Sequence, residues 1–189
     1  METNAHKTIV DILKSEKVLD KKGDWLNLNK LWAKPDTRRL FTTQLINVLQ
    51  EEAVFTDDPV IIHPEGVASS YGILPIVSLL VDKLELRLAI WREIGDIVTT
   101  TSMIFPDISS FSHNLNCIII QDVIGKGTTL RKMFQTLSDL EWHVTSYIAI
   151  VQIEKFQAEL ENNIHICKDI TSPNFKFIGI IKSSEIGVK

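Results

Sequence analysis

Residues 117–130 of this 189-residue chain have the sequence CIIIQDVIGKGTTL. The first four residues are apolar and mostly β-branched, which is typical of a central parallel strand that is buried on both faces. Gln121 and Asp122 follow at the carboxyl end of this strand, and Gly125 and Gly127 form a short turn before a helix begins. This order of strand, acid, glycine turn and helix predicts an α/β fold with a ligand site beyond the end of the strand.

Strands and helices alternate along the rest of the chain. Apolar runs predict strands at residues 60–62, 86–91, 144–151 and 175–181. Helical spacing predicts helices at residues 8–13, 36–49, 71–84, 129–140 and 155–160. Such alternation predicts a central parallel sheet with helices on both of its faces.

Two segments have a less regular pattern. Residues 25–29 alternate between apolar and polar and predict a further short strand. Residues 92–116 have no clear period and predict a long loop or a weak hairpin. Because the sequence shows no linker, repeat or low-complexity tract, we expect a single domain over residues 1–189.

The composition, with 44% hydrophobic and 23% charged residues, is that of an ordinary globular protein. A net charge of -4 and a pI near 5.7 argue against nucleic acid as the main partner, because phosphate backbones are bound by Lys and Arg. The apolar runs are too short to span a membrane, and the N-terminus has no apolar signal core. With only Cys117 and Cys167, no disulfide framework is indicated. We expect a cytoplasmic protein.

The glycine turn has the chemistry of a phosphate cradle. Glycines let a backbone approach a ligand closely, and free N–H groups at the start of a helix bind anions. Further donors follow at Lys126, Thr128 and Thr129. The glycine spacing fits neither a Walker loop nor the dinucleotide fingerprint. The alternative is a strand-to-helix turn whose Gly and Thr serve purely local purposes.

The stretch around Asp122 resembles the phosphoribosyl-pyrophosphate motif of type I phosphoribosyltransferases, and the chain is most similar to the orotate enzymes among them. Residues 19–49 resemble the basic turn, strand and helix of that family, and residues 61–91 resemble its pyrophosphate loop with the helix and strand beyond. The resemblance implies a type I phosphoribosyltransferase-like fold, with a small N-terminal hood over residues 1–35 and a core over residues 36–189.

The resemblance also implies a reaction. A phosphoribosyl group would pass from phosphoribosyl pyrophosphate (PRPP) to a nitrogenous, pyrimidine-like base, with orotate as the candidate. Pyrophosphate would be released and Mg²⁺ would be carried by the ligand rather than by direct protein ligands. Such enzymes commonly form homodimers, so the resemblance implies a homodimer for this chain.

The resemblance assigns roles to three groups of residues. The ribose and 5′-phosphate would be held by Gln121, Asp122, Gly125, Lys126, Gly127, Thr128 and Thr129. The pyrophosphate loop would comprise Glu65, Gly66, Val67, Ala68, Ser69 and Ser70. Further contacts to the base or to pyrophosphate would come from Lys21, Lys22, Trp25 and Arg92. The catalytic residues would be Asp122 and Arg92.

The sequence departs from the family pattern at three places. Gln121 stands where the motif has the first of two acids, and Lys126 stands where a small residue is usual. Residues 93–125, which include the equivalent of a lysine-rich mobile loop, hold four acids and no Lys or Arg. Three functions therefore remain open: an active transferase, a catalytically impaired regulatory protein that binds PRPP or a nucleotide, and a protein of the same fold with another phosphorylated ligand. The intact turn after Asp122 narrowly favours the enzyme.

His63 lies at the end of the strand predicted at residues 60–62. Because no second catalytic partner is identifiable near it in the sequence, we interpret it as a structural histidine.

Overall fold

Successive residues of the central strand alternate between two hydrophobic cores, because neighbouring side chains of a strand point to opposite faces of the sheet. In a computed structural model of the chain, Ile118 and Ile120 of β4 (Asn116–Ile124) lie in one core, and Cys117 and Ile119 lie in the other. The apolar run is thus buried on both faces, as the sequence predicts. The structure describes residues 3–18, 27–31, 33–55, 58–65, 73–95, 100–105, 114–168 and 171–188.

The sheet has six strands in the order β3-β2-β1-β4-β5-β6. Its strands other than β4 are β1 (Val60–Glu65), β2 (Arg87–Gly95), β3 (Thr100–Phe105), β5 (His143–Gln152) and β6 (Thr171–Lys182). All neighbours pair in parallel except β2 and β3, which are antiparallel. β4 therefore lies inside a parallel sheet, as predicted.

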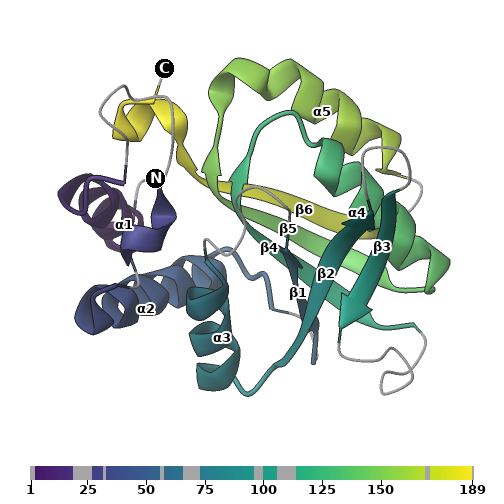
Figure 1. Cartoon of the computed structure of the whole chain (residues 1–189), viewed down its shortest axis with the longest axis horizontal. Coiled ribbons are helices and arrows are strands. Elements are labelled where there is room, and N and C mark those ends of the chain that lie inside the picture. The colour runs from purple at the N-terminus through teal and green to yellow at the C-terminus, as the bar shows by residue number, and fades with distance from the viewer. Residues whose placement is uncertain are drawn as a thin grey trace.

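Helices cover both faces of the sheet (Figure 1). One face carries α1 (Asn4–Ser15), α2 (Pro35–Glu51) and α3 (Leu74–Lys83), and the other carries α4 (Thr128–Asp139) and α5 (Gln157–Ile166). The predicted α/β fold with helices on both faces is thereby confirmed. Within the described part of the chain, no helix is both long and apolar enough to cross a membrane.

The N-terminal helix is held against the C-terminal end of the chain. α1 packs on α2, and the Nε2 atom of His6 lies 2.8 Å from Oε1 of Glu185 in the short helix η6 (Ser183–Ile186). Of the predicted N-terminal hood, residues 1–2, 19–26 and 32 lie outside the described residues.

The structure corrects two predictions from the sequence and decides between two alternatives in a third. The strand expected at residues 25–29 is wrong at its end, where Leu28 and Leu31 begin and end the 3₁₀ helix η1 (Leu28–Leu31) and both are buried at helical spacing. Of the two forms allowed for residues 92–116, the hairpin is correct, since β2 pairs with β3. Finally, α5 runs to Ile166, whereas the sequence predicts a helix that ends at residue 160. The prediction was too short because Leu160 is the only buried residue of α5, so the apolar pattern that indicates a helix is weak there.

Candidate functional site

The topology of the sheet marks one edge as the place for a ligand. The backbone pairing between β1 and β4 covers only Val60–Ile62 against Cys117–Ile119. Beyond it, β1 remains paired with β2 as far as Glu65, and β4 remains paired with β5 as far as Ile124. The strand order also reverses between β1 and β4. Open α/β sheets bind ligands beyond the carboxyl ends of the strands at such a switch point.

Asp122 lies at this edge, at the end of β4, and is only 5% exposed. Burial raises the pKa of its carboxyl group, while a hydrogen bond from the Val123 N–H and the nearby His63 act in the opposite direction. The Val123 nitrogen lies 2.7 Å from Oδ1 of Asp122. A buried carboxyl with a perturbed pKa at a switch point is a functional-site candidate.

Gln121 is bonded into the interior on the α4 side of the sheet. Its Oε1 atom accepts a hydrogen bond from the phenolic hydroxyl of Tyr147, and its Nε2 atom donates to the Val123 carbonyl oxygen at 2.9 Å. Burial raises the pKa of the Tyr147 phenol, and the charge of Asp122 adds to this shift, so the phenol remains a proton donor. Both polar atoms of the Gln121 amide are thus engaged in internal hydrogen bonds.

The glycine turn leads directly into α4. Gly127 is the N-cap residue, with a φ of 80°. Because glycine has no side chain, it makes no capping hydrogen bond to the first N–H groups of α4. The first N–H groups of a helix have no partner within the helix, so the start of α4 offers donors to an anion. The predicted helix after the glycine turn is therefore present, and the binding of phosphate by Gly127, Thr128 and Thr129 stays a prediction.

The two glycines also have a packing reason. A Cβ atom on Gly127 would lie 2.9 Å from Cδ1 of Leu160, and one on Gly125 would lie 3.2 Å from Cδ2 of Phe156. The turn therefore lies close against η4 (Glu154–Phe156) and α5. Local packing, the alternative considered for these glycines, contributes to their presence.

The sequence analysis did not identify three residues that lie beside the turn, namely Asn163, Lys155 and Phe156. Asn163 of α5 donates from Nδ2 to the Lys126 carbonyl oxygen at 2.8 Å. The ammonium groups of Lys126 and Lys155 lie 5.2 Å and 5.3 Å from the ring centroid of Phe156. The sequence signal that could have identified Lys155 and Phe156 is their position just after β5. Because parallel neighbours end at the same edge of a sheet, residues that follow β5 lie near those that follow β4.

A groove adjoins the turn on the α4 and α5 side. It has a volume of about 550 Å³ and is lined by Thr128, Arg131 and Lys132 of α4 and by Asn163 and Cys167 near α5, among others. Thr128 thus belongs both to the turn and to the groove. The cationic side chains of α4 add to the positive character of this end of the helix.

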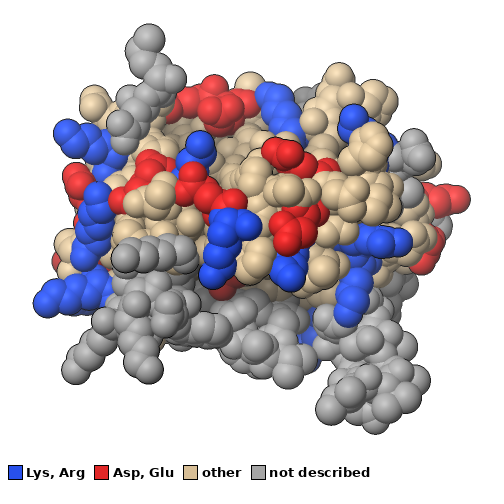
Figure 2. Space-filling model, turned by 90° about the horizontal axis from the view of Figure 1, so that it is seen from above, with Lys and Arg blue, Asp and Glu red and all other residues tan. Residues whose placement is uncertain are grey.

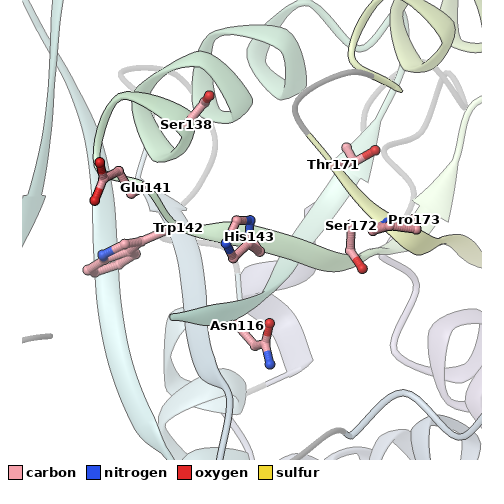
Figure 3. A pocket seen from close by; sticks show the side chains of 8 residues that line it. All are labelled: Asn116, Ser138, Glu141, Trp142, His143, Thr171, Ser172 and Pro173. Carbon is pink, nitrogen blue, oxygen red and sulfur yellow. The ribbon is translucent and has the colours of Figure 1, made fainter. Parts of the chain in front are cut away.

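A second pocket, of about 480 Å³, lies at the opposite edge of the sheet (Figure 3). Asn116 and His143 come from the starts of β4 and β5, and Thr171 and Ser172 come from the start of β6. Ser138 comes from the last turn of α4. Because this pocket is at the amino ends of the strands, it is separate from the predicted site.

The remaining predicted residues are placed only in part. Arg92 is exposed on β2, and its backbone is in register with Glu65, so both lie at the same edge as Asp122. Outside the described residues lie Lys21, Lys22, Trp25, Gly66, Val67, Ala68, Ser69 and Ser70. Over the described part of the chain, no cluster of three or more His, Cys, Asp or Glu side chains forms a metal site.

Charges are mixed on one large face of the molecule. Figure 2 shows Lys and Arg side chains of the described residues interspersed with Asp and Glu on this face. A nucleic-acid surface gathers its cations into a patch. This face does not have that character.

The comparisons with known proteins place the fold. No protein-family model matches the chain, and no curated protein matches its sequence. Among solved structures, it is similar to an adenine phosphoribosyltransferase from Trypanosoma brucei, with a TM-score of 0.69 and 11% identity, over 97% of this chain and 81% of that one. An orotate phosphoribosyltransferase from Aeropyrum pernix gives a TM-score of 0.68 at 15% identity, over 94% and 95% of the two chains. The match to UMP synthase from Leishmania donovani has a TM-score of 0.67 at 14% identity and covers 98% of this chain but 38% of that one.

Proposed function

From the type I phosphoribosyltransferase fold of this chain, we propose that it binds PRPP at the β1–β4 switch point and transfers the phosphoribosyl group to a nitrogenous base. The observation that carries the proposal is the buried Asp122 at the end of β4, followed by the start of α4 at Gly127. The order of motifs along the sequence favours a pyrimidine-like base such as orotate. The solved structures similar to the chain include both adenine and orotate enzymes.

In the proposed complex, the phosphate, the ribose and the pyrophosphate of PRPP would each meet a complementary group. The N–H groups at the start of α4 would bind the 5′-phosphate, and Asp122 would accept hydrogen bonds from ribose hydroxyls. The ammonium groups of Lys126 and Lys155, which share the Phe156 ring, would add positive charge beside the phosphate. Arg92 and the backbone of Glu65 lie at the edge where pyrophosphate would be bound.

Mg²⁺ fits this site as an ion that arrives with the ligand. It commonly binds through one or two carboxylates together with substrate phosphates and water, rather than through a cage of protein ligands. Asp122 would hold ribose hydroxyls or metal-bound water beside the ion, and when bound the ion would neutralise charge on the pyrophosphate.

The proposed reaction exchanges one bond at the anomeric carbon for another. The bond to the pyrophosphate oxygen breaks, the bond to a ring nitrogen of the base forms, and the proton of that nitrogen is released. Positive charge develops on the ribose as pyrophosphate departs. The Asp122 carboxylate beside the ribose would stabilise that charge, and the buried position of Asp122 strengthens the interaction.

A specific observation favours a second function. The amide of Gln121 is engaged by Tyr147 and by the Val123 carbonyl, so the site has one carboxylate where the family motif has two. Losing one preorganised charge contact typically costs about a hundredfold in rate. The alternative is accordingly a regulatory protein of the same fold that binds PRPP or a nucleotide without appreciable turnover.

A steady-state assay of pyrophosphate release separates these functions. PRPP and Mg²⁺ are supplied with orotate, uracil, adenine or no base. The proposal predicts base-dependent release, with orotate turnover at least about a hundredfold below an enzyme median near 10 per second. Binding of PRPP without release for any base would establish the regulatory alternative, and absence of both would exclude the two functions together.

A further inference from the structure

His63 connects the two strands that border the proposed site. It lies near the carboxyl end of β1, is fully buried, and its Nδ1 atom is 2.9 Å from the carbonyl oxygen of Ile120 on β4. Because a carbonyl oxygen only accepts hydrogen bonds, Nδ1 must carry a proton and donate it. The imidazole thus joins β1 to β4 two residues before Asp122.

This bond occurs where the backbone pairing between the strands stops. The last backbone pair between β1 and β4 is Ile62 with Ile119, and the next residues along the two strands are His63 and Ile120. Beyond this point each strand is paired only with its outer neighbour, β2 or β5. A side-chain hydrogen bond therefore continues the connection for one further step after the ladder ends.

The two strands lead to different halves of the proposed site. β1 ends at Glu65, the first residue of the predicted pyrophosphate loop, and β4 leads to Asp122 and the turn at Gly127. PRPP carries a phosphate on one side of its ribose and pyrophosphate on the other, so it must contact both halves together. The distance between the ends of β1 and β4 consequently determines whether one ligand can reach both.

We propose that His63 is a positioning residue that fixes the end of β4, and with it Asp122 and the glycine turn, against the end of β1. This inference rests on the proposed PRPP site and adds to it a residue that need not touch the ligand. It revises the interpretation of His63 as only structural.

Two substitutions of similar size separate positioning from general stability. Asn in place of His63 keeps an N–H donor near the position of Nδ1, whereas Leu fills similar volume without a donor. His63→Asn should preserve the bond to the Ile120 carbonyl, and His63→Leu should remove it. The exposed His143, at the opposite edge of the sheet, provides the control His143→Leu.

The first measurement needs no ligand. In ¹H–¹⁵N correlation spectra of the ligand-free proteins, His63→Leu should shift the amide signals of Asp122 to Thr129, whereas His63→Asn and His143→Leu should leave them near their wild-type positions. Equal shifts in both His63 variants, or none in either, would overturn the proposal. If His63→Leu does not fold, the wild-type histidine tautomer decides: long-range ¹⁵N spectra must show His63 protonated at Nδ1.

The second measurement is titration of each protein with PRPP and Mg²⁺. We expect His63→Leu to lose at least about tenfold in affinity and His63→Asn to stay within about threefold of wild type. If wild type fails to bind PRPP but the amide shifts behave as predicted, the proposed function fails and the positioning role stands. If wild type binds and both His63 variants bind equally well, the function stands and the positioning role fails.

Discussion

The phenolic hydroxyl of Tyr147 donates a hydrogen bond to the side-chain oxygen of Gln121, and the amide nitrogen of Gln121 donates to the Val123 carbonyl. Tyr147 is fully buried on β5, so this pair ties the end of β4 to the adjacent strand. The residue that departs most from the acidic motif is therefore an internal hydrogen-bonding element of the turn.

Restoring an acid at this position should not restore activity. Gln121→Glu would place a carboxylate oxygen against the Val123 carbonyl oxygen and would add negative charge beside Asp122. We expect the free energy of unfolding to fall by about 1–3 kcal/mol, with no gain in turnover. Chemical denaturation and the pyrophosphate-release assay measure the two effects. Gln44→Glu on α2, where Gln44 is partly exposed, is the matched charge control and should change stability by less than about 0.5 kcal/mol. A marked rise in turnover for Gln121→Glu would show that the amide itself limits catalysis.

The Asp122 carboxyl should make the protein less stable as the pH rises. Its raised pKa means that the folded protein holds the proton more tightly than the unfolded chain, so stability is lost as the pH rises through the titration of this carboxyl. Asp122→Asn removes the charge but keeps an oxygen that can accept from Val123.

The Asp122→Asn variant should therefore melt at a higher temperature than wild type at about pH 7, and the difference should vanish near pH 3, where an aspartate is protonated in both states. Thermal unfolding followed by circular dichroism checks this, with the exposed Asp139→Asn as control for the loss of a charge. A lower melting temperature for Asp122→Asn at neutral pH would contradict the direction of the pKa shift. The same variant should lose PRPP binding, as expected where stability and function conflict.

Gly127→Ala should impair both stability and binding. At a φ of 80° a non-glycine residue costs about 1–2 kcal/mol, and the added Cβ atom would also lie 2.9 Å from Leu160. Gly187 in the C-terminal segment has a φ of 82° and offers a control with equal backbone strain far along the chain from the turn. Gly187→Ala should lose the stability that corresponds to backbone strain alone and should leave PRPP affinity unchanged. Equal affinities of the two variants for PRPP would count against a role of the turn in binding.

Lys155 should contribute to the binding of an anion, a role that its position just after β5 indicates only once the parallel pairing of β4 and β5 is known. Its ammonium group and that of Lys126 lie over the same Phe156 ring, beside Gly125. Lys155→Ala should weaken PRPP binding several-fold at low ionic strength and less at about 1 M salt, because salt screens exposed charges. Lys7→Ala, on the exposed face of α1, is the control. An effect of Lys155→Ala that does not depend on salt would point to lost packing instead of lost charge.

Much of the site could be predicted because it is local. The strand up to Ile120, the turn at Gly127 and the start of α4 are specified by apolar residues, glycines and hydroxyls that lie next to one another. The contacts of Gln121 could not be predicted, since Tyr147 is distant in sequence and meets it only through the pairing of β4 with β5. The same holds for His63, whose partner is a backbone carbonyl on another strand.

Binding of PRPP at the start of α4 is the central claim, and calorimetric titration of the wild-type chain with PRPP in the presence of Mg²⁺ tests it most directly. The account predicts saturable binding of one PRPP per chain, weakened by at least about tenfold in Gly127→Ala and unchanged in Gly187→Ala. Absence of measurable binding by the folded wild-type protein, or equal affinity in wild type and Gly127→Ala, would contradict it.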